Sequence, residues 1–324
     1  MGRLSSLPSA LVTDDSALGG LVVERSLRFN EPDAANLTRT PSSAGNRRTF
    51  TISVWAKRCA DGAMFGAYIS DSDRATLRFS SDFIEFQSAG ASVKTTGKFR
   101  DSHTWYHIVA AIDTTQGTQS NRGKIYVNGV QQTLQTNNFS QNVETSVNNN
   151  SVQVFGTRWI SGAPNSNFNG YLAEINLIDG FQLDASYFGY TDFQTGTWKP
   201  KFYSGSYGTN GVRLDFSDNS AATAVTLGKD RSGQGNDFTP NNLVVSDALL
   251  DTPSNNFATL KTLGTPAETT IQEGNLYLDT NNTGSARANR LTAFSTYFVN
   301  SGKWYCEHYH LAVHTMIGLS LIHI

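Results

Sequence analysis

The segment AEINLID, residues 173–179, carries two carboxylates that could do chemistry together. Two carboxylates that flank a glycosidic bond can serve as nucleophile and as general acid and base, about 5 Å apart in retaining hydrolases. Glu174 and Asp179 form the available pair, with Asn176 between them. Asn176 cannot ionise, and the side chain of Asp179 is one methylene shorter than that of a glutamate. We therefore expect no catalytic residue, and hydrolysis of a glycan is kept as an alternative.

Histidines near the C-terminal end form a second cluster with possible chemistry. His308 and His310 would share one face of a strand, and His314 follows closely. Imidazole nitrogens suit transition metals. The alternative is that these side chains lie on the solvent face of a β-domain, and we predict no firm metal site here.

Oxygen ligands for calcium occur in two loops. Asp71 and Asp73 in SDSD are weak calcium candidates on an expected rim loop. The glycine-rich loop DRSGQGND offers a further set of oxygens, from Asp230, Ser232 and Asn236. A calcium loop of this kind needs a glutamate at its twelfth position, where this chain has Asn241, so a simple turn is favoured. Calcium is the one cofactor considered, and none is predicted firmly.

A binding surface rather than a catalytic site is indicated by TRWISGAPNSNFNG, residues 157–170. An aromatic ring can stack on the flat apolar face of a sugar, while polar neighbours hydrogen-bond its hydroxyls. The alternative is a tryptophan that packs over the edge of a sheet. The candidate glycan-binding residues in this loop are Trp159, Arg158, Asn165, Asn167 and Asn169.

Short strands separated by polar turns must position these residues. In HTWYHIVAAID, Val109 and Ala111 fall on one face of a strand and Ile108 and Ala110 on the other, so both faces would be covered. Such a strand belongs inside a sandwich. Further along, Asn128-Gly129 predicts a two-residue type I′ hairpin turn.

The strand TFTISVWAKR alternates more regularly. Phe50 and Ile52 would face inward, whereas Thr51, Ser53 and Trp55 occupy the opposite face. This alternation predicts a strand that packs against the core on one face and is partly wet on the other.

Five segments then carry a family resemblance: SLRFNEPDAANLTRT, TFTISVWAKR, WYHIVAAID, GKIYVNGV and FNGYLAEINLIDG. In this order they resemble the laminin-G-like, concanavalin A-like jelly-roll family, over residues 21–190. The resemblance implies an all-β jelly-roll sandwich, with ligands held along the rim and concave face. It also implies a comparison with the family's hydrolases, which carry Glu-x-Asp-x-(x)-Glu where this chain has Glu174, Asn176 and Asp179. Non-catalytic laminin-G-like domains close with a matching strand as well.

Two further resemblances, beyond residue 190, indicate how the rest of the chain divides into domains. SYGTNGVRLDFSDNS and LGKDRSGQGNDFTP resemble connecting segments in structural proteins of tailed bacteriophages, and SGKWY resembles the start of a SPRY-type sandwich. We expect this second β-domain to be truncated. The predicted divisions are an N-terminal leader over 1–20, a laminin-G-like jelly roll over 21–190, an irregular connector over 191–262, and the start of a SPRY-like β-domain over 263–324.

Composition narrows the possible partners. The 25 basic and 27 acidic residues give a net charge of −2, and no basic cluster is interleaved with aromatics, so no nucleic-acid partner is expected. No apolar run reaches the length of a membrane span, so no membrane partner is expected either. Cys59 and Cys306 lie too far apart in sequence to imply a disulfide framework.

The sequence thus predicts a non-enzymatic, tail-associated structural protein of a phage virion, or otherwise a protein of an extracellular surface. Its jelly roll would adhere to a host surface glycan. Other virion tail proteins are the expected partners, and the chain would form a homo-oligomer, with a trimer as the leading possibility. The alternatives are a purely structural decoration module without glycan binding and a concanavalin A-like glycoside hydrolase.

Overall fold

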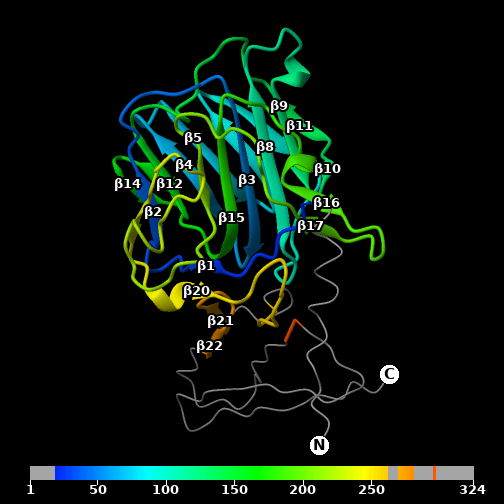
Figure 1. Cartoon of the computed structure of the whole chain (residues 1–324), viewed down its shortest axis with the longest axis vertical. Helices are drawn as coiled ribbons and strands as arrows, with labels where there is room; N and C mark the ends of the chain where they lie inside the picture. The colour runs from blue at the N-terminus through cyan, green and yellow to red at the C-terminus, as the bar shows by residue number, and fades with distance from the viewer. Residues whose placement is uncertain (1–18, 262–268, 281–294, 297–324) are drawn as a thin grey trace, which may run out of the picture.

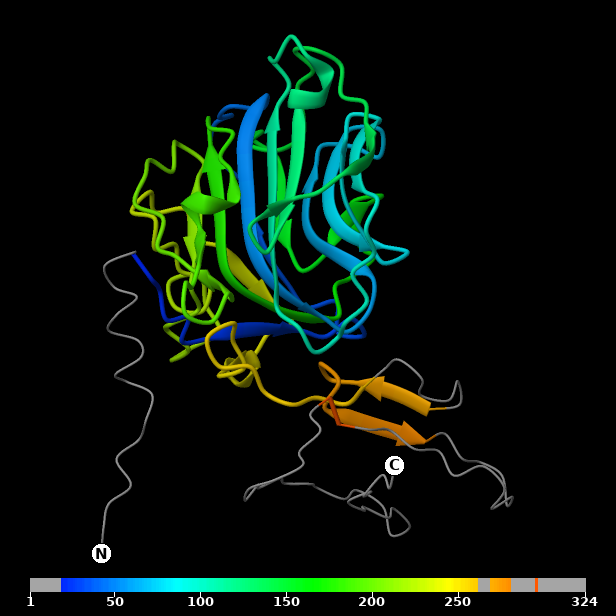
Figure 2. The ribbon, with the colours of Figure 1, turned by 90° about the vertical axis from the view of Figure 1, so that its right-hand side faces the viewer.

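The computed structural model describes residues 19–261, 269–280 and 295–296 of the chain. Two antiparallel β-sheets pack face to face and make up almost all of the regular structure (Figures 1 and 2). The predicted all-β jelly-roll sandwich is confirmed. Several expectations lie outside the described residues: the first 18 residues of the leader, Cys306, the histidines at 308, 310 and 314, and most of the SPRY-like region.

The first sheet has β15 near its centre. β3 pairs with one edge of β15, and β1 and β18 pair with successive parts of its other edge. In spatial order the strands are β10 (Val130–Gln131), β9 (Gly123–Val127), β8 (Tyr106–Asp113), β3 (Thr49–Arg58), β15 (Gly170–Asp179), β1 (Ser26–Phe29) and β20 (Ala248–Leu249), with β18 (Val212–Leu214) also on β15.

The second sheet faces the first across the core (Figure 2). In spatial order its strands are β11 (Leu134–Asn137), β7 (Ala91–Thr95), β6 (Phe83–Ser88), β5 (Arg74–Ser80), β4 (Gly62–Tyr68), β12 (Val152–Phe155), β2 (Asn36–Arg39) and β19 (Thr239–Asn241). Three two-stranded ribbons and three short 3₁₀ helices complete the described elements: β13 (Arg158–Ile160) with β14 (Ala163–Asn165), β16 (Gly189–Thr191) with β17 (Trp198–Pro200), β21 (Thr269–Gln272) with β22 (Tyr277–Thr280), η2 (Gln119–Asn121), η3 (Ala185–Tyr187) and η4 (Val245–Asp247).

The predicted hairpin turn is confirmed. Asn128 and Gly129 have φ values of 47° and 81° and join β9 to β10. Both residues of a type I′ turn need positive φ, which asparagine and glycine tolerate best. The turn therefore fixes the register of β9 against β10.

Alternating apolar side chains from both sheets fill the space between them. Ile108 and Ala110 of β8 point into this core, as the alternation predicts. Val109 and Ala111 point to the opposite side of β8, where they belong to a second apolar cluster with Tyr203 and other residues. The prediction that β8 is covered on both faces is confirmed.

The side of β3 that points away from the core is more buried than the alternation predicts. Thr51 and Ser53, expected to be partly wet, are 0% and 1% exposed. The cause is the chain after β15, which returns across the first sheet and covers it. Thr51 Oγ1 donates to the Phe181 carbonyl and accepts from the Leu183 amide, both at 2.8 Å, so the hydroxyl remains satisfied away from water.

A buried histidine helps to hold this cover in place. Trp198 of β17 donates its indole N–H to His107 Nδ1 at 3.0 Å, and His107 Nε2 lies 2.9 Å from Ser53 Oγ. Burial lowers the pKa of His107 to about 3. The imidazole is therefore neutral, with its proton on Nε2, and it acts as a hydrogen-bond bridge between β8 and the cover.

The segment after residue 190, expected to be an irregular connector, has largely irregular backbone. It nevertheless packs on the sandwich, because β18, β19 and β20 each pair with a jelly-roll strand. Its side chains Leu214 and Phe238 also enter the core between the sheets. We therefore expect residues 212–249 to resist proteolysis together with the jelly roll.

The hairpin β21–β22 lies beyond one end of the sandwich (Figure 2) and is tied to it by polar contacts. Tyr171 donates its hydroxyl to the Gly274 carbonyl at 2.5 Å. Arg28 forms ion pairs with Asp247 at 2.9 Å and with Glu273 at 3.1 Å. Across the residues that the structure describes, no helix has the length and apolarity of a membrane span.

Candidate functional site

The open sheet face of the sandwich belongs to the second sheet. The first sheet is covered on its outer side, whereas the outward side chains of β5 and β6 include the partly exposed Arg74, Arg78 and Gln87. Leu77 and Phe86 lie in the core, so alternation places Arg78, Glu85 and Gln87 on the opposite side. We call this surface the outer face. It consists of the outward residues Tyr68, Arg74, Thr76, Arg78, Phe83, Glu85, Gln87 and Lys94.

The hairpin β13–β14 crosses over one side of the outer face. A Cβ atom on Gly66 of β4 would lie 2.9 Å from the Cα of Arg158 and 3.0 Å from the carbonyl oxygen of Thr157. Only a glycine therefore allows the two backbones to come so close. The hairpin turns at Ser161 and Gly162, whose φ values are 51° and 75°.

Trp159 lies against the outer face rather than at a distant edge. Its ring centroid is 6.2 Å from that of Tyr68, with an interplanar angle of 47°. The tryptophan side chain is half-buried, so part of the ring remains accessible. The two aromatic rings thus offer an apolar platform beside the polar outward residues of β5, which is an arrangement suited to the mixed surface of a sugar.

The five predicted glycan-binding residues separate into two groups. Arg158, Trp159 and Asn165 lie on the hairpin, where Arg158 donates to Asn165 Oδ1 over 3.5 Å. Asn167 lies at the base of the hairpin, where it accepts from Thr157 Oγ1 and donates to the Glu31 carbonyl. Asn169 is only 9% exposed. The structure therefore does not bring the last two onto the outer face with Trp159.

The calcium candidates Asp71 and Asp73 are engaged by other groups. Asp71 accepts from the Ser161 amide at 2.6 Å and from its hydroxyl at 3.1 Å, which ties the hairpin tip to the loop after β4. The Ser161 amide hydrogen bond is the main cause that lowers the pKa of Asp71. Asp73 accepts from Ser146 Oγ at 2.6 Å. Both carboxylates thus have structural roles at the rim.

The carboxylate that could have served as a nucleophile is closed off. Glu174 is 3% exposed and forms a bidentate pair with Arg213 of β18, with distances of 2.6 Å to Nε and 2.9 Å to the terminal nitrogen. Glu174 also has a φ of 41°, at an irregularity where β15 shifts register against β3. Burial raises the pKa of Glu174, and the Arg213 hydrogen bonds oppose that rise.

The other two residues of the segment are equally occupied. Asn176 accepts from the Tyr207 hydroxyl at 2.8 Å. Asp179 accepts from the Asn46 and Asn210 amides at 2.7 and 3.0 Å. Glu174, Asn176 and Asp179 therefore hold the cover and the loops to the first sheet, and none of them lines an open cleft with a second free carboxylate.

The glycine-rich loop at residue 230 satisfies its own oxygens. Asp230 accepts from the Arg213, Ser232 and Asn236 amides at 3.0, 2.8 and 2.8 Å. This pattern stabilises a turn. Within the described ranges of the chain, no group of three or more histidine, cysteine, aspartate or glutamate side chains could hold a metal ion.

Arg74, Arg78 and Glu85 of the outer face were missed by the sequence interpretation. The signal was present in RATLRFSS, where Arg74 and Arg78 lie four positions apart and so share the face opposite buried Leu77. Their significance depends on the position of the hairpin, which comes from a segment about 80 residues later. A local sequence pattern does not predict that the hairpin β13–β14 packs beside β5.

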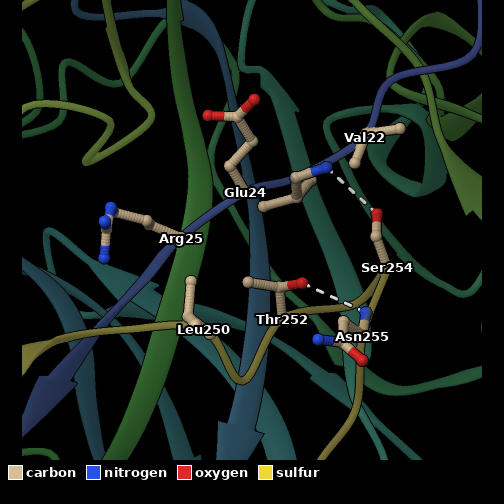
Figure 3. A pocket seen from close by; sticks show the side chains of 8 residues that line it. Val22, Glu24, Arg25, Leu250, Thr252, Ser254 and Asn255 are labelled. Carbon is tan, nitrogen blue, oxygen red and sulfur yellow. Dashed lines mark hydrogen bonds between the residues drawn. The ribbon is translucent and has the colours of Figure 1, made fainter. Parts of the chain in front are cut away.

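A separate hollow lies at the end of the sandwich near β20 (Figure 3). It is lined by the entering chain and the chain after β20, and Val23 donates its amide to Ser254 Oγ at 3.0 Å across it. Glu24 and Arg25 extend away from Thr252 in the figure. None of the predicted site residues lines this hollow, which makes the outer face the better candidate.

Comparison with known proteins agrees with this architecture. Residues 32–182 match the family described as the concanavalin A-like lectin/glucanases superfamily. The match covers a little under half of the chain and lies within the two-sheet sandwich. A search among curated proteins found no match.

Three solved structures are similar to this chain at low sequence identity. A candidate carbohydrate binding protein from Bacteroides ovatus ATCC 8483 is 14% identical, with a TM-score of 0.44 over 68% of this chain and 59% of the other. Domains LG4-5 of the mouse laminin alpha1 chain are 12% identical, with a TM-score of 0.38 over 60% of this chain and 48% of the other. The CBM40 of the Ruminococcus gnavus IT-sialidase is 9% identical, with a TM-score of 0.31 over 47% of this chain and 85% of the other. The chain thus spans about three fifths of the Bacteroides protein.

Proposed function

We propose that this protein is a non-enzymatic glycan-binding module, and that the outer face of the second sheet is its binding surface. The observation that carries the proposal is the hairpin β13–β14, which brings Trp159 beside Tyr68 at the border of a polar sheet face. Aromatic rings supply apolar contact to sugar rings, and the surrounding side chains supply hydrogen bonds. The superfamily match of residues 32–182 supports the same class of ligand.

The outer face is suited to weak binding by a single copy. It is a sheet surface bordered by one hairpin rather than a deep apolar pocket, so little of a ligand would be buried. Several linked copies can raise the overall affinity by roughly 10²–10⁴ without any new contact. We infer that useful adhesion relies on a homo-oligomer, with a trimer as the proposed state.

The proposed setting is the tail of a phage virion, where the module would adhere to a glycan on the host surface. The support for this setting is the resemblance of SYGTNGVRLDFSDNS and LGKDRSGQGNDFTP to connecting segments of phage structural proteins. Other virion tail proteins are the proposed partners. A chain that packs its connecting segment onto its own jelly roll, as β18–β20 do, suits a rigid particle component.

A hydrolase is less well supported than a binding module. Glu174 is buried and paired with Arg213, so it is not free to attack an anomeric carbon or to exchange protons with a leaving group. A decoration module that binds no glycan is the second candidate. It requires only the rigid sandwich and assigns no role to the exposed part of Trp159.

Replacing Trp159 with alanine should weaken glycan binding about tenfold per site, because the aromatic platform contributes roughly 1–1.5 kcal/mol beyond simple contact. The measurement is a glycan array probed with the full chain displayed in many copies on a bead. Such beads should show retention on at least one host-type polysaccharide and a strong loss for Trp159→Ala.

The matched control is Phe193→Ala. Phe193 is an aromatic residue of the connector that is 83% exposed and lies outside the outer face. This variant should bind as the unchanged protein does. If the array retains no glycan, or if the two variants behave alike, the decoration module becomes the better description.

A further inference from the structure

Cationic side chains are concentrated on the outer face. Arg74 and Arg78 project from β5, and Lys94 projects from β7 because its neighbour Val93 lies in the core. Lys94 lies 4.7 Å above the ring of Phe83. The one carboxylate among the outer-face residues is Glu85. This excess of positive charge is local, since the whole chain has a net charge of −2.

The hairpin adds a third arginine to this surface. Arg158 begins β13 directly over Gly66 of β4, next to the strand that carries Arg74 and Arg78. Arg78 is neutralised by Glu85, which accepts from two of its nitrogens at 3.0 and 2.8 Å. Within the part of the chain that the structure describes, neither Arg74 nor Arg158 forms a salt bridge.

The electrostatics of Arg158 agree with this geometry. Burial is the largest cause that lowers its pKa, and the like charges of Arg78 and Arg74 lower it further, while Glu85 opposes them. Neighbouring cations that lack a counter-charge repel one another, and an anion placed between them would relieve that repulsion. A guanidinium group also matches carboxylate and sulfate oxygens in a two-pronged geometry.

The carboxylate of Asp71, at the rim, does not fill this role. It is held by the amide and hydroxyl of Ser161 and by the Tyr68 hydroxyl at 3.3 Å. Its charge lies close enough to Arg74 to be affected by it, but the two form no ion pair. Among the described residues, Arg74 and Arg158 thus form no ion pair with a carboxylate, since Asp73 and Glu85 pair with Arg47 and Arg78.

We propose that the outer face selects anionic glycans, with a carboxylate or sulfate group of the sugar held by Arg158 and Arg74 and the sugar ring resting on Trp159 and Tyr68. This inference rests on the proposed function and names the ligand class for the same surface. Arg78 is neutralised by Glu85 and is not one of the proposed ligand-binding arginines. Outward Gln87, on neighbouring β6, is partly exposed and supplies hydrogen bonds to uncharged hydroxyls.

Matched probe pairs test the charge requirement. The full chain, displayed in many copies on a sensor surface, is offered 3′-sialyllactose against lactose for the carboxylate, and dextran sulfate against dextran for the sulfate. We expect at least one charged probe to bind at least tenfold more tightly than its neutral partner. The pair that shows the difference identifies which anionic group is preferred.

Two charge-removing variants locate the effect. Arg158→Gln and Arg74→Gln should each weaken binding of the preferred charged probe about tenfold or more, because a charge-assisted hydrogen bond is lost. The control is Arg231→Gln, which removes a half-exposed arginine of the connector that lies 3.6 Å from Asp215. Its binding should be unchanged, and thermal unfolding of all three variants should show that they remain folded.

The outcomes separate this inference from the proposed function. If neutral and charged probes bind alike and Trp159→Ala abolishes both, the glycan-binding function stands and the anionic preference is wrong. Charged binding that survives Arg158→Gln and Arg74→Gln, or falls equally in Arg231→Gln, would also overturn the inference, since it would reflect diffuse attraction. If no glycan binds in either this experiment or the array, the proposed function itself fails.

Discussion

Replacing Lys57 with methionine is expected to destabilise the folded protein by about 3–5 kcal/mol, because it leaves a buried carboxylate without its cation. The Lys57 side chain is 0% exposed, and its ammonium group lies 2.8 Å from Asp251 Oδ2. The same group donates to Asn256 Oδ1 and to the Phe257 carbonyl, each at 2.8 Å. All three donors of the ammonium group are used, and all three bonds run from β3 to the chain after β20.

Urea denaturation followed by tryptophan fluorescence measures this effect. The matched control is Lys229→Met, because Lys229 is exposed and its removal should change the free energy of unfolding by less than about 0.5 kcal/mol. The double variant Lys57→Met with Asp251→Asn should cost less than the sum of the two single variants, since the unpaired charge is gone. A loss below about 1 kcal/mol for Lys57→Met would mean that the segment after β20 does not dock on β3 as described.

The Glu174→Gln variant should lose about 3 kcal/mol of stability without losing any hydrolytic activity. Removing this carboxylate leaves the Arg213 guanidinium buried beside the more distant Asp215, at 3.5 Å, and breaking one partner of a buried pair is costly. Denaturant midpoints measure the stability, and release of reducing sugar from a β-glucan measures hydrolysis. The same experiment therefore distinguishes a structural carboxylate from a catalytic one.

Two comparisons sharpen this result. Arg213→Met should destabilise by a similar amount, and the double variant Glu174→Gln with Arg213→Met should recover part of the loss. If the unchanged protein instead released reducing sugar and Glu174→Gln abolished that activity at unchanged stability, the hydrolase alternative would replace the binding module.

The sequence indicates the sandwich well wherever a local pattern decides the structure. The two apolar faces of β8 and the Asn128-Gly129 turn are determined by neighbouring residues, and both predictions are confirmed. On the side of β3 that points away from the core, the local pattern gives the wrong prediction. Thr51 and Ser53 have the polarity of a wet surface, yet they are buried because the chain after β15 returns across the first sheet. The Ser53 hydroxyl is satisfied by His107 of the same sheet. The alternating pattern shows which side chains of a strand are polar. Whether they are buried depends on which later segment of the chain covers the strand.

The candidate site shows the same division. Trp159 was identifiable as an aromatic among polar residues in an irregular loop, and the structure places it on the hairpin β13–β14. Arg74 and Arg158 become a pair of neighbours only through the pairing of β4 with β5 and the close approach that Gly66 permits. No signal within either segment alone predicts that meeting.

The most direct test of the central claim is to locate a bound glycan by hydrogen–deuterium exchange of the full chain, using the glycan that the array retains most strongly. Exchange is followed in peptides that cover the hairpin β13–β14, the loop at 69–73 and the hollow near β20. We predict slower exchange in the hairpin and in that loop when the glycan is present, because their amides border the outer face. Slowing confined to residues 22–25 and 250–255, with the hairpin unchanged, would contradict the account and move the binding surface to the hollow.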